Sequence, residues 1–535
     1  MASLPIRTYT LAPFSELRIV SHDSHDGIPV LPSVKLLNTP AAAADLLPNM
    51  RGTAEIYGRE LAPDVDRTIE EGEKLAVFTW VGCSVQVKGM VEQEYDGEDH
   101  AMKEYLNVAN VLNAERELAS VKRTQGPRVL ITGAPSSGKS TVAMLLCNYA
   151  LRGGWTPVFV EADPRASTDK RQIQFYPGTI GATVVTNAAE MDSKNPLVYF
   201  YGYSGAQENE KLYLQISKSM GASLDAMMEN SSQTQPHSRR SDEVSDMGKY
   251  IAASGMIINA PYSANRDLIV KLAEIYSVSL ILVIDSPSVR QDLVRTFAAI
   301  RDGQRAATPL TGVRGDVAPG ALGNLAFQET PEQKAHTQSD LNETQTAFDG
   351  ADASDDKATR EVTVLAINKL EGVVPVDLER VKYLNSRCWK RYFQRTNAGE
   401  MHVIRFPMEN VKLVVLETSV ALSKDALPTD DTGYMTRNEV YASMWNGDPF
   451  SLTNGVLGIP AADDATLIPY CNLLGFVLVR KVEERAQQPD AETDGEPAPR
   501  TYVMEVLCPA VYSPSSLPAY LLVAGNQRVM RWQTI

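Results

Sequence analysis

The chain has 535 residues, of which 51 are Lys or Arg and 66 are Asp or Glu, giving a formal net charge of −15. A chain of this length exceeds what one hydrophobic core supports, so two to four domains are expected. The hydrophobic content of 44% is typical of a soluble globular protein. The acidic balance excludes a protein that coats nucleic acid through its overall charge, so any such contact must be a local basic patch.

The five cysteines are scattered along the chain and have no C-x-x-C spacing. This usage favours a reducing compartment, without disulfides or a structural zinc site. The longest apolar runs, such as Val278–Ile284, have the length of strands, so no membrane-spanning segment is predicted. The first residues lack the basic and apolar regions of a secretory signal.

The first block, residues 1–121, is rich in short strands and is predicted to be β-sandwich-like. Its alternating, β-branched and aromatic segments are separated by Gly, Pro and Asp turns. The predicted strands are Ser15–Val20, Gly52–Tyr57, Lys74–Trp80 and Ser84–Lys88. A linking helix is predicted at Asn107–Arg123, where Leu112, Leu118 and Val121 recur at helical spacing.

Residues 128–147 combine an apolar strand, a glycine-containing loop and the start of an apolar-periodic helix. From Gly133 to Ser140 the loop matches the pattern G-x-x-x-x-G-K-S, in which glycines let backbone N–H groups point toward phosphates. The following helix would aim the positive end of its dipole at the same phosphates. The pattern predicts a nucleoside-triphosphate site, where Lys139 reaches the β- and γ-phosphates and the Ser140 hydroxyl ligates Mg²⁺. A glycine- and serine-rich turn that binds nothing is the alternative.

The central block, residues 122–394, alternates strands and helices, which indicates an α/β domain with a mostly parallel sheet. A helix is expected from Ser140 to Arg152, where Gly153 and Gly154 end it. The predicted strands are Arg128–Thr132, Thr156–Glu161, Met256–Asn259, Ser279–Asp285 and Val362–Asn368. The block is therefore predicted to have the P-loop NTPase fold.

Three stretches have too few apolar residues to offset their ordering entropy and are predicted to be disordered surface inserts. They are residues 228–246, 302–360 and 486–499. The last block, residues 395–535, is predicted to be a smaller, β-containing domain. Its predicted strands are Met401–Phe406, Lys412–Leu416, Leu473–Val479 and Tyr502–Leu507.

Three segments of the N-terminal block are distinctive in sequence, namely Glu16–Arg18, Gly52–Leu61 and Ala76–Cys83. They are followed in order by Tyr105–Asn107, Gly126–Val129, Asn148–Ala150, Val160–Asp163, Pro177–Thr179, Trp389–Phe393 and Gly475–Val477. Together these segments resemble the polynucleotide 5′-hydroxyl kinase family, specifically its branch in the pre-mRNA cleavage and polyadenylation machinery. The N-terminal segments are the specific part of the resemblance, because P-loop proteins at large do not share them.

The resemblance implies that ATP and Mg²⁺ are the cofactors and that the N-terminal β-domain contributes to the nucleotide site. Glu16 and Lys74 match the family's nucleotide-contacting positions. The phosphate-binding segment of the family is matched by Ser136, Ser137, Gly138, Lys139, Ser140 and Thr141, after Gly133. Asp163 matches the carboxylate that holds magnesium through water or deprotonates the incoming 5′-hydroxyl. The alternative for Asp163 is an aspartate that only caps the turn before Pro164.

On the acceptor side the chain departs from the pattern of active family members. These have a Gly-Gln pair after the aspartate, where this chain has Pro164 and Arg165. They also place a tryptophan after an Asn-Thr-Cys-Gly stretch, where this chain reads Asn259-Ala260-Pro261-Tyr262-Ser263. Tyr262 is the aromatic residue available to stack there, although Pro261 alters the path of the chain.

The family's mobile arginine lid corresponds to the region just beyond Asp285. Arg290 and Arg295 are available there, but Ser288 occupies one expected arginine position. Arg295 is the candidate catalytic arginine beside Lys139 and Asp163. A solvated helix face is the alternative for both arginines.

The sequence does not favour a GTPase, because it lacks a good match to the element with which GTPases recognise guanine. GTP-binding proteins carry an N-K-x-D element, and the nearest stretch is Asn368-Lys369-Leu370-Glu371. Glutamate stands there in place of the aspartate that would hold guanine, and the stretch follows the long second insert.

Residues 380–395 interleave arginines and lysines with Tyr383, Trp389, Tyr392 and Phe393. Such a segment could stack RNA bases on its rings while its cations hold phosphates. The favoured interpretation is a long helix with its aromatic face in the core and its charges in water.

An intact nucleotide half beside an altered acceptor half leaves two functions open. The favoured one is an ATP-binding subunit of the nuclear pre-mRNA 3′-end cleavage and polyadenylation machinery, with nucleotide as a structural ligand and the complex's other subunits as partners. The alternative is an active ATP-dependent RNA 5′-hydroxyl kinase in tRNA splicing or RNA processing, whose partners would include RNA 5′ ends.

Overall fold

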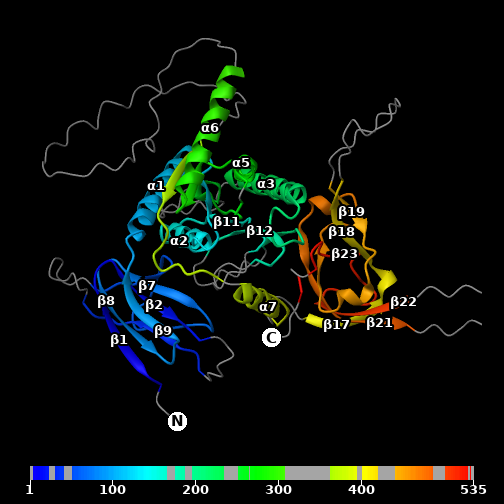
Figure 1. Cartoon of the computed structure of the whole chain (residues 1–535), viewed down its shortest axis with the longest axis horizontal. Helices are drawn as coiled ribbons and strands as arrows, with labels where there is room; N and C mark the ends of the chain where they lie inside the picture. The colour runs from blue at the N-terminus through cyan, green and yellow to red at the C-terminus, as the bar shows by residue number, and fades with distance from the viewer. Residues whose placement is uncertain are drawn as a thin grey trace, which may run out of the picture.

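The computed structural model describes residues 4–22, 30–40, 51–165, 175–186, 196–233, 251–263, 265–307, 362–376, 378–394, 401–419, 440–485, 501–527 and 530–531. Figure 1 shows three folded parts along the chain: a β-domain in blue, a helix-covered sheet in cyan to green, and a second β-domain in yellow to red. Among the described residues, no helix is long and apolar enough to cross a membrane.

The N-terminal part is built from two sheets, with the strand orders β1-β8-β3-β6 and β5-β4-β7-β2-β9. The strands are β1 Ile6–Leu11, β2 Ser15–Val20, β3 Ser33–Leu36, β4 Glu55–Ile56, β5 Arg59–Glu60, β6 Asp66–Thr68, β7 Lys74–Thr79, β8 Cys83–Lys88 and β9 Gln93–Glu98. Alternating residues such as Leu17, Val77 and Val85 form a common core. This confirms the predicted sandwich. β4 is shorter than predicted at both ends, and it stops before Tyr57 because the chain turns at Tyr57 and Gly58, both with positive φ.

Helix α1, Met102–Lys122, follows the sandwich and packs into the central core through Tyr105 and Leu112. It begins five residues earlier than predicted. The expected apolar stripe is only partly correct, because Leu118 and Val121 are 53% and 83% exposed. The helix carries apolar residues on both its buried and its outer side, so helical spacing alone did not identify the buried face.

The central sheet has the strand order β13-β12-β11-β14-β10-β15-β16. Its strands are β10 Arg128–Gly133, β11 Val158–Glu161, β12 Thr179–Val184, β13 Leu197–Phe200, β14 Met256–Asn259, β15 Leu280–Ile284 and β16 Thr363–Ile367. β11, β14, β10, β15 and β16 run parallel, whereas β12 and β13 add antiparallel strands at one edge. The α/β prediction is confirmed, and β12 and β13 are the strands it lacked.

The helices of the central part are α2 Lys139–Arg152, α3 Glu210–Gln233, α4 Ile251–Ser254, α5 Arg266–Ile275, α6 Pro287–Ala307 and α7 Leu378–Gln394. Figure 1 shows α2, α3 and α5 at the central strands, with α6 projecting upward and α7 below, between the two β-domains. Because parallel strands end at one edge, the loops after β10, β11, β14 and β15 meet there. That edge carries the candidate site.

The first residues of the two predicted inserts in this block were wrongly predicted. α3 continues through residue 233 and α6 through residue 307, so the first residues of both stretches are helical. Buried Met228 and Leu293 anchor these helices, and an anchored helix propagates into polar residues at little cost. Residues 234–246 and 308–360, and the third insert at 486–499, lie outside the described residues.

The C-terminal part is a sheet with the order β17-β22-β21-β20-β23-β18-β19. Its strands are β17 Met401–Pro407, β18 Lys412–Thr418, β19 Val440–Met444, β20 Val456–Pro460, β21 Leu473–Arg485, β22 Thr501–Pro509 and β23 Tyr520–Leu522, with short 3₁₀ turns η4 Met408–Asn410, η6 Pro449–Leu452 and η7 Ile468–Tyr470. This confirms the predicted β-containing domain. The domain limits at residues 121/122 and 394/395 stay predictions.

Helix α7 contacts all three parts. Trp389 is fully buried, stacks on Tyr176 of the central part at 5.4 Å between ring centroids, and meets Phe476 of β21 edge-on at 5.0 Å. On its other side, Arg391 forms an ion pair with Glu70 of the N-terminal part at 2.5 Å. The aromatic face of residues 380–395 therefore lies in the core, as the favoured interpretation predicted. Its charges are not all in water, because Arg387 and Arg391 both pair with Glu70.

Candidate functional site

The phosphate loop connects the end of β10 to the start of α2 and depends on its two glycines. Gly138 has φ +88°, in the left-handed region that favours glycine. A Cβ atom on Gly133 would lie 2.8 Å from the carbonyl oxygen of Ile284, which belongs to the neighbouring backbone. Ser136, between them, also has a positive φ of 55°. The loop thus adopts the curled backbone that sequence analysis predicted for phosphate binding.

Lys139 is buried at the centre of this loop, with 8% of its surface exposed. Its Nζ donates to the carbonyl oxygens of Gly133 at 3.3 Å and Ala134 at 3.0 Å. Burial lowers the pKa of Lys139, while the negative charge of Asp163 opposes that shift. The nearby Ser137 hydroxyl is buried without a hydrogen-bond partner among the described residues. A bound anion would give the buried Lys139 cation an opposite charge and give the Ser137 hydroxyl a hydrogen-bond partner.

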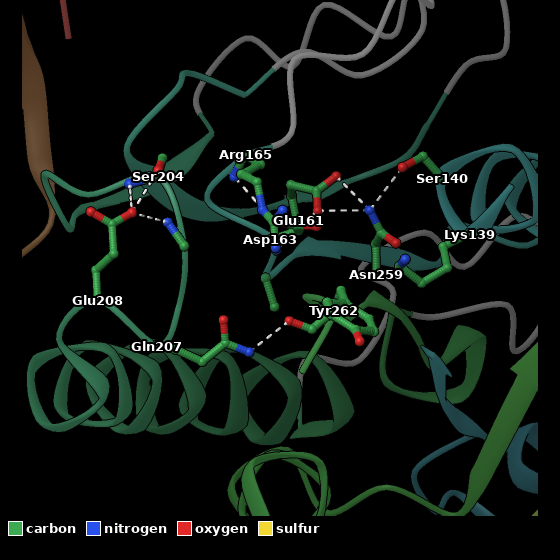
Figure 2. A network of polar contacts seen from close by, with 12 residues as sticks. Lys139, Ser140, Glu161, Asp163, Arg165, Ser204, Gln207, Glu208, Asn259 and Tyr262 are labelled. Carbon is green, nitrogen blue, oxygen red and sulfur yellow. Dashed lines mark hydrogen bonds and ion pairs between the residues drawn. The ribbon is translucent and has the colours of Figure 1, made fainter. Parts of the chain in front are cut away.

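The Glu161 carboxylate and the Asn259 amide lie beside the first turn of α2. Glu161 ends β11 and lies in register with Asn259, which ends β14. Asn259 Nδ2 donates to Ser140 Oγ at 3.0 Å and to the two Glu161 carboxylate oxygens at 2.8 and 3.0 Å (Figure 2). Burial, together with the charge of Asp163, raises the pKa of Glu161 to about 8.

Asp163 follows β11 by two residues and shares this cluster. Its backbone N–H donates to Glu161 Oε1 at 3.1 Å, and its Oδ1 accepts from the backbone N–H of Arg165 at 3.1 Å. Burial raises the pKa of Asp163. The side chain therefore does cap the local turn, as the alternative stated, while also lying beside the phosphate loop. Hydroxyl and carboxylate oxygens from Ser140, Glu161 and Asp163 form the hard donor set that Mg²⁺ prefers.

Sequence reasoning did not select Glu161 and Asn259 as site residues. The available signal was a carboxylate at the last position of an aliphatic strand, since side chains at the carboxyl ends of parallel strands face the ligand crevice. Thr141 was selected and lies half-buried in the first turn of α2.

Glu16 is connected to the phosphate loop through the segment that follows β16. It is 3% exposed on β2 and forms an ion pair with Arg18 at 2.5 Å, and burial raises its pKa. A Cβ on Gly372 would lie 3.2 Å from Glu16 Oε1, so this segment contacts the carboxylate directly. A few residues on, the backbone N–H of Val376 donates to Ser136 Oγ at 3.5 Å.

Lys74 is not brought beside Glu16. It is exposed at the start of β7 and lies opposite Val20 in the β2–β7 register, whereas Glu16 lies opposite Phe78. Four residues of a strand span about 13 Å. The predicted role of Lys74 in contacting nucleotide therefore stays a prediction.

Asn368, the first residue of the GTPase-like stretch, is tied to α1. Its Nδ2 donates to Glu104 Oε1 at 2.6 Å, and its backbone N–H donates to Glu104 Oε2 at 3.1 Å. An asparagine held in this way does not present its amide to a base, which agrees with the disfavoured status of a GTPase.

The acceptor-side residues also follow the strand ends of this edge. Pro164 is buried, and Arg165 is exposed with its Nε 3.9 Å from Asp163 Oδ1. Tyr262 is half-buried, and its carbonyl oxygen accepts from Gln207 Nε2 at 3.0 Å.

The three lid positions lie on α6. Ser288, Arg290 and Arg295 are all exposed, and Arg295 comes roughly two turns after the start of the helix. The catalytic role of Arg295 stays a prediction.

The raised pKa of Glu161 gives a test of this cluster in the nucleotide-free protein. The folded value of about 8 exceeds the ordinary 4.5, so the stability that this group contributes is complete below pH 4.5 and is lost progressively as pH rises to about 8. We expect the unfolding temperature of wild type to fall between about pH 5 and pH 8 relative to that of Glu161→Gln. Scanning calorimetry of both proteins across this range measures the difference, and parallel curves would contradict a buried, neutral Glu161.

Family models match two segments of the chain. Residues 33–119 match the N-terminal β-sandwich domain of polyadenylation factor, and residues 133–310 match the P-loop domain of mRNA cleavage and polyadenylation factor CLP1. These segments contain most of the N-terminal sandwich and the phosphate loop with its strand-end carboxylates.

Known CLP1-type proteins resemble the chain over different lengths. A CLP1 homologue of Nematostella vectensis is 32% identical over 46% of this chain and 55% of its own length. The human polyribonucleotide 5′-hydroxyl-kinase Clp1 is 34% identical over 46% of this chain and 54% of its own length, so the match spans about half of these relatives. An Arabidopsis thaliana CLP1 homologue is 24% identical over 89% of this chain and 88% of its own length.

A solved structure shares the whole fold. Clp1p in the Clp1p–Pcf11p complex aligns with a TM-score of 0.62 and 18% identity, covering 98% of both chains. At that identity the likeness concerns the fold. The family-model matches, the relatives and the shared fold confirm the resemblance found in the sequence: residues 33–119 and 133–310 of the chain are similar to the N-terminal and P-loop domains of CLP1-type mRNA cleavage and polyadenylation factors.

Proposed function

We propose that this chain is an ATP-binding, nuclear subunit of the pre-mRNA 3′-end cleavage and polyadenylation machinery, and that it uses nucleotide mainly as a structural ligand. The observation that carries the proposal is the contrast between the two halves of the site. Lys139 and the phosphate loop are complete, whereas Pro164, Pro261 and Ser288 replace residues that active relatives use on the acceptor side. Phosphoryl transfer depends on positioning both partners, so loss of one half leaves binding without efficient chemistry.

The nucleotide half has a residue for each requirement of an ATP·Mg²⁺ site. Backbone N–H groups of the loop and the Lys139 ammonium would hold the phosphates, and Ser140, Asp163 and Glu161 would hold the metal. Bound Mg²⁺ neutralises phosphate charge. Glu16 contacts the segment beside the loop, so bound nucleotide would also stabilise the junction between the N-terminal and central parts.

Similar proteins support the proposal that the partners are cleavage and polyadenylation subunits. The solved neighbour is a complex of Clp1p with Pcf11p, and one family model describes an mRNA cleavage and polyadenylation factor. We infer that the partners of this chain are other subunits of that complex.

The second candidate is an active RNA 5′-hydroxyl kinase in tRNA splicing or RNA processing. The human relative carries the name of such a kinase. Tyr262, Arg165 and the two arginines of α6 are the groups that would replace the missing acceptor residues.

Copurification tests the favoured function. We expect tagged wild type to recover cleavage and polyadenylation subunits from nuclear extract and Lys139→Ala to recover several-fold less, because nucleotide would no longer stabilise the domain junction. Lys122→Ala, which removes an exposed lysine at the end of α1, is the matched control. Recovery of no such subunit by wild type would refute the proposal.

A further inference from the structure

The turn before α3, Gly202–Asn209, lies between the acceptor side of the site and the C-terminal β-domain. Two consecutive residues make the two connections. Gln207 Nε2 donates to the carbonyl oxygen of Tyr262 at 3.0 Å, and Glu208 Oε2 accepts from Nδ2 of Asn526 at 3.3 Å. Figure 2 shows Gln207 reaching to Tyr262 and Glu208 reaching to Ser204.

Glu208 also holds the turn in shape. Its Oε1 accepts from the backbone N–H of Ser204 at 3.0 Å, from the Ser204 hydroxyl at 2.5 Å and from the backbone N–H of Gly205 at 2.8 Å. Burial raises the pKa of Glu208, but hydrogen bonds from Ser204, Asn526 and Gly205 outweigh it and hold the pKa below its ordinary value. One oxygen therefore organises the turn while the other faces the C-terminal domain.

Against the C-terminal domain, the turn packs backbone to backbone. The N–H of Asn526 donates to the carbonyl oxygen of Gly202 at 3.0 Å. A Cβ on Gly202 would lie 3.1 Å from Ala524 Cα, and one on Gly525 would lie 2.2 Å from the Tyr203 hydroxyl oxygen. Such close approach leaves the turn little freedom to shift relative to the segment after β23.

On its other side, the turn supports Pro261–Ser263, which follows β14 at the edge of the phosphate loop. Arg266 Nη1 donates to the carbonyl oxygen of Ser263 at 3.3 Å, and Arg165 lies beside Asp163 at the same edge. Stacking on an aromatic ring and charge from guanidinium groups hold an unpaired base and its phosphates. This edge of the site carries both kinds of group, in Tyr262 and in Arg165 and Arg266.

We propose that Gln207 and Glu208 are positioning residues for a single-stranded RNA end, and that through Asn526 the C-terminal domain sets the acceptor side of the site. Gln207 fixes the backbone of Tyr262 and thereby its ring, while Glu208 ties the same turn to the C-terminal domain. The inference rests on the second candidate function given above, the RNA 5′-hydroxyl kinase, because it takes an RNA 5′ end as the molecule that approaches the phosphate loop.

The test measures binding of a 5′-hydroxyl oligoribonucleotide, labelled at its 3′ end, to the full chain with Mg²⁺ and a non-hydrolysable ATP analogue. We expect Gln207→Ala to weaken RNA binding about 3- to 10-fold, as loss of one hydrogen bond implies. Asn526→Asp should have a similar effect, because it places a second carboxylate against Glu208. Affinity for the ATP analogue should stay within about twofold of wild type in both.

A rescue separates positioning from general damage. In the double variant Glu208→Gln and Asn526→Asp, the new amide can donate to the new carboxylate while its oxygen still accepts from Ser204 and Gly205. We expect RNA affinity to return to within about twofold of wild type. Asn107→Asp, an exposed position on α1, serves as the control for the added charge and should change nothing.

Each outcome of these measurements decides either this inference or the proposed function. Wild-type RNA affinity in Gln207→Ala and Asn526→Asp overturns the inference, and so does equal loss of RNA and of the ATP analogue, since the turn would then support the whole site. If wild type binds the analogue but no RNA, this inference fails while the nucleotide site stands. If wild type binds neither, the proposed function fails as well.

Discussion

Replacing Lys139 with alanine is expected to weaken binding of ATP·Mg²⁺ about 100-fold or more. The ammonium is buried within the loop and donates only to neutral backbone carbonyls of Gly133 and Ala134. A phosphate would exchange these for charge-assisted hydrogen bonds, each of which contributes about 1.5–3 kcal/mol. Equilibrium dialysis with ATP and Mg²⁺ measures the change, with Lys122→Ala as the control lysine.

The same substitution should not destabilise the nucleotide-free protein. Burial lowers the pKa of Lys139, which means that the folded chain bears a cost for keeping this cation out of water. The unfolding temperature of Lys139→Ala without nucleotide should therefore equal or exceed that of wild type. An unchanged affinity for ATP in this variant would remove the central claim of a phosphate-binding loop.

Wild-type protein is expected to transfer phosphate to a 5′-hydroxyl oligoribonucleotide about 100-fold or more slowly than an active family member. The donor side is intact, but Pro164 and Pro261 stand where active relatives orient the acceptor hydroxyl. Orientation accounts for a large share of the rate of phosphoryl transfer. A kinase assay with labelled ATP compares wild type, Asp163→Asn and Lys139→Ala under identical conditions.

Robust turnover by wild type that disappears in both variants would overturn the structural-ligand proposal and establish the kinase. In that case Arg295→Ala decides whether the exposed arginine of α6 closes over the phosphates. Equal inactivity of all three proteins, with ATP bound only when Lys139 is present, is the result that the structural-ligand proposal predicts.

The phosphate loop could be predicted from sequence because its determinants are contiguous. From Gly133 to Thr141, backbone conformation and helix start are encoded within nine residues. The strands β2 and β14 were likewise predicted to the residue, since their hydrophobic patterns end at clear breaks.

The remainder of the site depends on the order of strands. The hydrogen bond from Asn259 to Ser140 joins positions 119 residues apart, and it exists because β14 pairs with β10, the strand that leads into the phosphate loop. The pairing of β14 with β11 on its other side sets Glu161 beside Asn259. No local pattern encodes that register. The exposure of Leu118 and Val121 on α1 has a similar origin, because tertiary packing chose between two apolar faces.

Helix α7 has a consequence for how the molecule unfolds. Trp389 belongs to the same core as Tyr176 and Phe476, and Arg391 reaches Glu70, so the helix owes its burial to three parts at once. Loosening any one of them uncovers apolar surface on the other two. The free energy of local opening should therefore approach that of global unfolding along this helix, and the three parts should behave as a single cooperative unit.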